Sequence, residues 1–232
     1  MTRLFGRDES GAARIFGMPV SRLWSGDGDA VFDTFEPENP SLFVPRKFGV
    51  GWDLNLGVIA VKTGWIRPDD SLPDLADHVS PTLKKALCMA PKLGAVAVMA
   101  SALALAGKDR VASGWGLTGL PRGFTSGKKA IIPPLLLAAL TTAGPLIATA
   151  RTSEHPQAAN FAWQAQKVGS QATALALLLA MHRSSRSGEH RDFLPVVAVA
   201  LWPLLASGLQ IACVKTALNN INTQLRNGNE GK

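Results

Sequence analysis

The residue types that most often ligate metals or haem are few in this sequence, which has four histidines and two cysteines among 232 residues. The histidines fall in connecting segments or at the ends of apolar stretches: His78, His155, His182 and His190. Haem in a helical bundle needs axial ligands inside facing helices, so these positions do not suit it. No zinc-ligand spacing, phosphate-binding loop or Gly-x-Ser-x-Gly elbow occurs either. The sequence therefore predicts no cofactor, no metal site and no catalytic residues, which favours a protein that is not an enzyme.

The cysteines, Cys88 and Cys213, lie near the ends of apolar segments, where a free thiol behaves as a small hydrophobic group. Two cysteines are too few for the disulfide framework of a small secreted domain. If the chain crosses a membrane four times, both thiols fall at the same membrane face and could approach each other.

An acidic segment near the N-terminus has part of the spacing of a calcium-binding loop. Asp27, Asp29 and Glu38 match the first, third and twelfth positions of such a loop. Val31 and Phe32 stand where it needs an acid or amide and then a glycine. We therefore expect an acidic, solvated loop here.

Ionisable side chains deep inside apolar segments mark transport pathways in membrane proteins. Lys92 and Lys167 are the candidates in this sequence. Lys92 is close enough to the start of its segment for the ammonium group to reach the headgroups. The simpler interpretation places both lysines near membrane interfaces.

The elements that would position these residues are long apolar segments, and charges are nearly absent from them. A helix needs roughly 20 apolar residues to cross a bilayer. The sequence predicts an all-α membrane protein with about four transmembrane helices in a bundle over residues 86–214, at 86–107, 130–150, 160–181 and 193–214. The segments 130–150 and 193–214 contain no charged residue, so they are the clearest spans.

The predicted span at 160–181 is the most polar of the four. Gln164, Lys167 and Gln171 lie in its first half, where they would be unfavourable against lipid. Side chains of this kind are accepted where they face other helices or a partner subunit. We therefore expect a buried contact in this half of the helix.

The regions outside the bundle are charged. Residues 1–68 are predicted to be largely irregular and polar, and residues 69–85 to form one amphipathic interfacial helix that Pro81 breaks or bends. Residues 215–232 are predicted to extend the last helix as an amphipathic tail. The connector after the first span carries Trp115, which could lie at headgroup level or contact a partner.

The most distinctive stretch reads NPSLFVPRKFGVGWDLN, over residues 39–55. It predicts short extended pieces joined by glycine-containing turns, with Phe43, Pro45, Arg46, Lys47 and Trp52 as candidate contacts to a partner or to lipid. It resembles a short domain of unknown function found in bacterial membrane proteins, some of which also resemble the sporulation-delaying-protein immunity family. The resemblance implies a bacterial membrane protein and implies no activity.

The net charge of +7 is typical of nucleic-acid-binding proteins, but the basic residues flank the apolar segments. Anionic headgroups favour them there, as at Lys84-Lys85 and Lys128-Lys129, so no nucleic-acid partner is predicted. The predicted location is the bacterial inner membrane, with several crossings. The positive-inside rule favours cytoplasmic connectors, whereas a long charged N-terminal region without an export signal favours a cytoplasmic N-terminus, the orientation adopted here.

The expected function is that of an accessory or stabilising subunit of a larger inner-membrane complex, with the lipid bilayer and other membrane subunits as partners. Composition and the resemblance suggest an actinobacterial source, in which a respiratory assembly is one such complex. The alternative is a small stand-alone transporter or a signalling or immunity protein.

Overall fold

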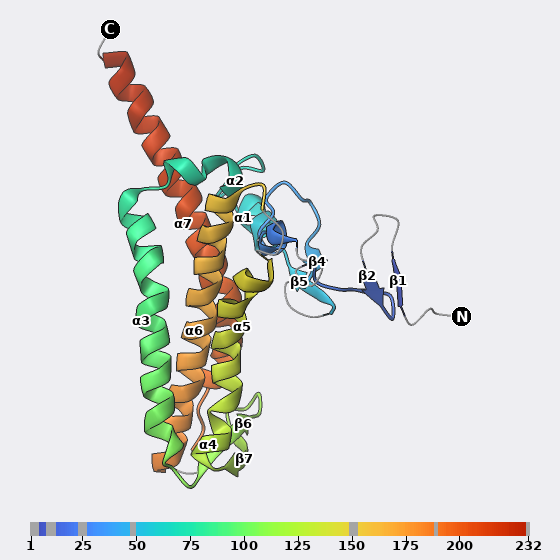
Figure 1. Cartoon of the computed structure of the whole chain (residues 1–232), viewed down its shortest axis with the longest axis vertical. Coiled ribbons are helices and arrows are strands. Elements are labelled where there is room, and N and C mark those ends of the chain that lie inside the picture. The colour runs from blue at the N-terminus through green and yellow to red at the C-terminus, as the bar shows by residue number, and fades with distance from the viewer. Residues whose placement is uncertain are drawn as a thin grey trace. The chain divides into compact units, whose positions relative to one another are not determined.

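The computed structural model describes most of the chain. The described residues are 5–7, 13–22, 27–46, 50–148, 153–187 and 190–230. They are mostly helical, and small antiparallel sheets accompany the helices (Figure 1). The prediction of a mainly helical protein is confirmed, but an all-α architecture is wrong, because seven short strands are present among the described residues.

Residue contacts divide the chain into two compact units. The first, called the bundle unit, comprises residues 86–143 and 164–206. The second, called the hairpin unit, comprises residues 1–85, 144–163 and 207–232.

The long helices are α3 (Pro81–Ala106), α5 (Ile132–Ala148), α6 (Pro156–Ser187) and α7 (Leu194–Glu230). Helix α3 begins at Pro81 and is followed by Gly107, which are the residue types favoured at the two ends of a helix. Helix α7 continues through Pro203 and on past residue 214, into the tail. Apolar stretches rich in alanine and leucine favour helix throughout these elements.

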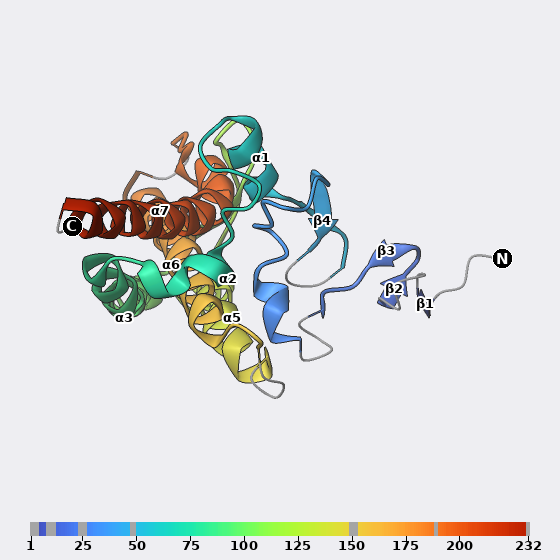
Figure 2. The same ribbon diagram turned by 90° about the horizontal axis from the view of Figure 1, so that it is seen from above.

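In the bundle unit, α6 contacts α3, α5 and α7, and it lies among them in the view along the helices (Figure 2). The core combines α3, α6 and the segment between α3 and α5. Its buried residues are Val98, Ala102, Leu105, Val111, Ala130, Ala174, Leu178 and Met181. Small residues at the contacts allow the helices to approach closely.

The connector between α3 and α5 is more ordered than an interfacial loop. It forms the antiparallel strands β6 (Val111–Trp115) and β7 (Pro121–Thr125), followed by the short helix α4 (Gly127–Ala130). Gly119 has a φ of +75°, which the turn between the strands requires and which glycine adopts without strain.

In the hairpin unit, the first three strands form one sheet and the next two form another. These strands are β1 (Phe5–Arg7), β2 (Ala13–Ile15), β3 (Met18–Pro19), β4 (Phe43–Pro45) and β5 (Trp52–Leu54). The short helices are η2 (Gly28–Val31), α1 (Leu56–Lys62), α2 (Leu72–Leu75) and η3 (Ala76–His78). The predicted extended pieces within residues 39–55 are therefore present as β4 and β5, while the expectation of an irregular region before residue 69 misses the first sheet.

The predicted amphipathic helix at 69–85 is divided. It becomes α2, η3 and the first turn of α3, with Val79 in an extended conformation at ψ 136°. The residue before a proline is disfavoured in the helical region, so Ser80 cannot easily continue a helix into Pro81.

Among the described residues, two helices are long and apolar enough to cross a membrane: Pro81–Ala106, and Leu194–Asn227 within α7. These two helices contain every residue of the predicted spans at 86–107 and 193–214 except Gly107 and Phe193. Helix α5 has 17 described residues, and positions 149 and 150 of that predicted span lie outside the described residues. Helix α6 contains 160–181 but is more polar. Four spans are therefore not supported by the described helices, because length limits α5 and composition limits α6.

Candidate functional site

The hairpin formed by β4 and β5 turns apolar side chains outward. Its residue pairs are Phe43 with Leu54, Val44 with Asp53 and Pro45 with Trp52. Paired residues of an antiparallel ladder point to the same side, and successive residues alternate. One side of the hairpin therefore carries Phe43, Pro45, Trp52 and Leu54, called the apolar face.

The apolar face is accessible, whereas the opposite side of β4 is buried. Phe43, Trp52 and Leu54 are 60%, 46% and 47% exposed, and Val44 on the other side is 2% exposed. Val44 thus attaches the hairpin to the core of its unit. The aromatic residues remain available for contact with another molecule.

Asn55 fixes the end of the hairpin and the start of α1. Its side-chain oxygen accepts hydrogen bonds from the backbone N–H groups of Gly57 at 3.0 Å and Glu36 at 3.1 Å. Its amide nitrogen donates to the carbonyl oxygens of Glu36 and Asn39, at 2.8 and 3.2 Å. Asn55 is fully buried, so each of these bonds satisfies a group that would otherwise lack water.

A second polar contact supports the segment that Asn55 holds. The guanidinium group of Arg22 donates to both carboxylate oxygens of Asp33, which is 3% exposed. This hydrogen bond raises the pKa of Arg22 against the opposing effect of desolvation. Arg22 also lies 3.9 Å from a carboxylate oxygen of Glu36, whose backbone binds Asn55.

The turn of the hairpin is tied to the preceding segment. Gly51 has a φ of +116° and donates its N–H to the carbonyl oxygen of Pro19, at 2.9 Å. Arg46 forms an ion pair of 3.5 Å with Asp53 on the partner strand. Lys47 lies outside the described residues. The hairpin is therefore held from both ends, which gives the apolar face a defined shape.

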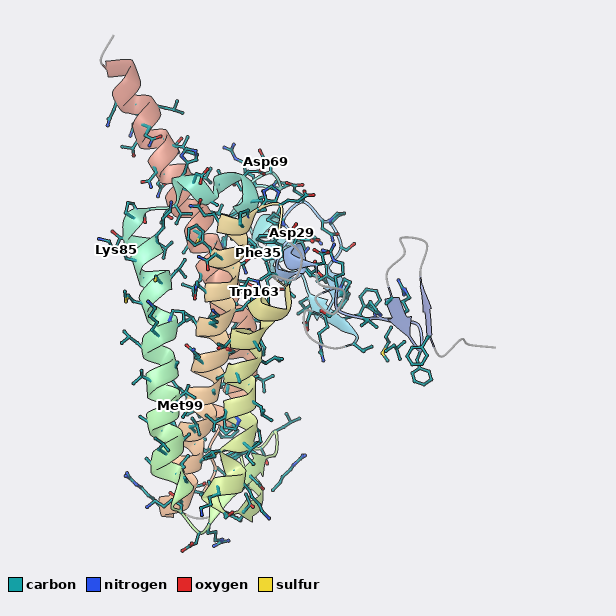
Figure 3. The ribbon with its side chains drawn as sticks, in the orientation of Figure 1. Asp29, Phe35, Asp69, Lys85, Met99 and Trp163 are labelled. Atoms are coloured by element: carbon teal, nitrogen blue, oxygen red, sulfur yellow. The ribbon has the colours of Figure 1, made fainter. Side chains whose placement is uncertain are left out.

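The acidic segment has structural roles. Asp27 accepts the N–H of Asp29 at the start of η2, and Asp29 accepts from the Ser153 hydroxyl and the Glu154 N–H (Figure 3). Glu38 is exposed. Among the residues described, no group of three or more His, Cys, Asp or Glu side chains has the geometry to hold a metal ion.

The remaining predicted contact residues lie outside the hairpin. Lys92 is exposed on α3, Trp115 lies on β6, and Gln164 and Lys167 are half-buried on α6. Gln171 is 4% exposed, and a Cβ atom placed on Gly94 would overlap its side-chain amide.

Neither cysteine forms a disulfide. Cys88 is exposed and Cys213 is buried.

The hydrogen bonds from α6 to its neighbours involve Gln166, which belongs to the polar half of the predicted span, and two residues that the sequence did not single out, Ser170 and Thr173. Gln166 accepts from the Trp202 indole at 2.7 Å, and Ser170 and Thr141 share a hydrogen bond of 2.7 Å. Thr173 donates to the carbonyl oxygen of Ala198 at 3.0 Å. The positions 166, 170 and 173 follow helical spacing, and that periodicity is the signal that could have found them.

Asn55 and Arg22 were also missed. An asparagine directly before the apolar stretch LGVIAVK is a helix N-cap signal, so Asn55 could have been recognised. The pairing of Arg22 with Asp33 has no comparable local signal.

Comparison with known proteins gives one match. Residues 37–57 match a family of unknown function (DUF5808). This segment contains the whole hairpin, Asn55 and the start of α1. No curated protein and no solved structure matches the chain significantly.

Proposed function

We propose that this chain is a non-catalytic integral membrane protein, an accessory or stabilising subunit of a larger bacterial inner-membrane complex. In this proposal the apolar face of the hairpin docks on another protein subunit of that complex. The observation that carries it is an exposed aromatic pair, Phe43 and Trp52, on a hairpin fixed by Asn55. Buried aromatic residues on rigid supports are the usual anchors of protein interfaces.

The exposed residues of α3 support the membrane part of the proposal. Leu93, Val96 and Leu103 are 70%, 68% and 68% exposed in the folded chain. In water this much apolar surface on one helix would be unfavourable and prone to association. Hydrocarbon removes that cost, and the helix is long enough to cross a bilayer.

A protein occupant explains the hairpin better than lipid alone. Insertion into headgroups needs aromatic side chains but not a backbone fixed by a buried asparagine and an ion pair. The segment that matches a family is also the hairpin itself. A hairpin that lies in a family segment and has a rigidly held backbone is suited to bind a specific protein surface.

The experiment is purification of the full chain from its native membrane in a mild detergent, followed by identification of co-purifying subunits. Phe43→Ala and Trp52→Ala should each weaken retention of the partner by roughly tenfold or more, as expected for interface anchors. The matched control is Trp65→Ala, because Trp65 is 60% exposed in the same unit but lies outside the hairpin. A chain that always migrates alone, or equal losses in all three variants, would contradict the proposal. The co-purifying proteins would also show whether the complex is a respiratory assembly.

The alternative is a stand-alone transporter or a signalling or immunity protein, and the buried polar residues of α6 are the observation that favours it. This alternative predicts that the isolated protein is active. Lys92→Ala and Lys167→Ala should then abolish transport or resistance, and unchanged activity in both variants would remove the alternative.

A further inference from the structure

A cavity lies in the bundle unit, where residues of β6, the end of α6 and the segment before α7 line it. Its volume is about 280 Å³. The lining side chains include Trp115, Arg183, His190, Arg191, Asp192 and Phe193. None of them belongs to the hairpin unit, so the cavity is separate from the apolar face.

The walls of the cavity are held together by contacts far apart in the sequence. The Ser184 hydroxyl, on α6, accepts the N–H of Ala112 on β6 at 3.0 Å. The N–H of Asp192 donates to the carbonyl oxygen of Gly119 at 2.8 Å. A Cβ atom on Gly119 would come within 3.0 Å of the Asp192 carbonyl oxygen, so the turn packs directly on this segment. The cavity is therefore preformed.

Two residues that line the cavity each have a buried polar atom with no hydrogen-bond partner among the described residues. One is the indole nitrogen of Trp115, a donor, and the other is Oδ2 of Asp192, an acceptor. Arg183 lies 3.6 Å from Oδ2, which is within ion-pair range but beyond a hydrogen bond. The other carboxylate oxygen, Oδ1, accepts the N–H of Leu194 at the start of α7. A ligand that satisfies both atoms must offer one acceptor and one donor.

The charge of the cavity favours an anion. Two guanidinium groups, Arg183 and Arg191, and one carboxylate, Asp192, line the cavity. Guanidinium groups bind phosphate oxygens through paired, charge-assisted hydrogen bonds. The Asp192 carboxylate would repel a simple anion, but it can accept a hydrogen bond from a donor group attached to the anion.

We propose that this cavity binds a phosphate ester that carries a neighbouring hydrogen-bond donor, such as the headgroup of phosphatidylethanolamine. The phosphate oxygens contact Arg183, Arg191 and the Trp115 indole, and the ammonium group donates to Asp192. Phe193 lies beside the first residue of α7, an apolar helix long enough to span, which puts the cavity at headgroup depth if α7 crosses the bilayer. A soluble ester such as phosphoethanolamine offers the same chemistry. The inference does not depend on partner docking by the hairpin.

The test uses the purified, delipidated full chain in detergent, with bound ligands counted by native mass spectrometry. The probes are phosphatidylethanolamine, phosphatidylcholine, whose quaternary ammonium has no N–H donor, and soluble phosphoethanolamine. We expect phosphatidylethanolamine to bind roughly tenfold more tightly than phosphatidylcholine, the effect of one hydrogen bond to a charged group. Competition by phosphoethanolamine at similar concentration would identify a soluble ester as the source, and lack of competition would identify the lipid.

Three variants locate the site. Arg191→Ala and Trp115→Phe should each weaken binding by roughly tenfold, and Asp192→Asn should abolish the preference over phosphatidylcholine while retaining an oxygen that caps α7. The matched control is Arg186→Ala, which removes the same charge from the exposed end of α6 outside the cavity. Equal binding of both lipids, an equal effect of Arg191→Ala and Arg186→Ala, or no binding of any probe would overturn the proposal. Retention of the protein partner is measured separately, so a failure of lipid binding would not count against docking by the hairpin.

Discussion

Helices α3 and α6 of the bundle unit distribute polarity in opposite ways. Helix α3 is apolar, yet Leu93, Val96 and Leu103 are mostly exposed, and Met99 is half-exposed beside them (Figure 3). Helix α6 carries glutamines, serines and threonines, yet Ser170 is fully buried. A water-soluble bundle places its residues the other way round.

The difference between the two helices shows which environment favours apolar side chains and which favours polar side chains. The buried side chains of Ser170 and Gln166 on α6 form hydrogen bonds with Thr141 of α5 and Trp202 of α7, inside the unit. Exposed apolar groups of α3 need hydrocarbon or another protein. This arrangement is expected of a helix bundle in lipid, where association depends on small residues and interhelical hydrogen bonds. The membrane proposal can therefore be tested separately on the two helices.

The largest effect is expected on the exposed side of α3. The double substitution Val96→Arg and Leu103→Arg should prevent stable membrane insertion of α3, because an arginine near the middle of a span, as at position 96, costs about 2.5–3.5 kcal/mol. Fractionation of cells should then show a strong fall in the amount of folded chain recovered from the membrane. The control is Val96→Ala with Leu103→Ala, which shortens the same side chains without adding charge. Normal folding of the arginine variant in the soluble fraction would reverse the interpretation of α3.

A smaller effect is expected where α6 meets α7. A Cβ atom on Gly169 would lie 2.6 Å from the carbonyl oxygen of Trp202. Gly169→Ala should therefore destabilise the bundle by about 1–3 kcal/mol, the usual cost of overpacking, and lower the Tm of the purified protein. Gly208, in α7, has nothing within 4 Å of such an atom. An equal loss of Tm in Gly208→Ala would show that helix glycines in general, rather than this contact, set the stability.

The smallest effect concerns the hydrogen bond between Thr141 and Ser170. A double-mutant cycle of Thr141→Val and Ser170→Ala should give a coupling of about 0.6 kcal/mol, as for other hydrogen bonds between membrane helices. Thermal or chemical unfolding in detergent measures it. Thr142→Val is the control, because Thr142 is exposed and its hydroxyl donates to the carbonyl oxygen of Ala138 in its own helix. A coupling of zero would mean that the polar side chains of α6 are buried without contributing to helix association.

The sequence was sufficient for features that depend on local chemistry. Long apolar segments predict α3 and most of α7, and the glycines and prolines of residues 39–55 predict the extended pieces of the hairpin. The polar half of α6 could be recognised as unsuited to lipid. Its partners could not, because Thr141 and Trp202 come from other helices and their positions depend on packing.

Features formed by residues that are far apart in the sequence could not be predicted from it, for the same reason. Arg22 and Asp33 are 11 residues apart, and the sequence between them has no repeating pattern that would predict their contact. The cavity brings Trp115 near Asp192 only because the β6–β7 turn packs on the segment before α7. The short strands β1 to β3 have two or three residues each, too few for an alternating pattern to be distinguished.

The bonds of Asn55 also bear on the order in which the chain folds during synthesis. Its partners Glu36, Asn39, Ser41, Gly57 and Val58 are at most 19 residues away along the chain. Contacts of such short range form quickly, and N-terminal segments fold first as the chain emerges from the ribosome. The hairpin can thus take shape before the apolar helices have been translated. If the apolar face docks on a partner, as proposed, it could bind that partner while the rest of the chain is still being inserted into the membrane.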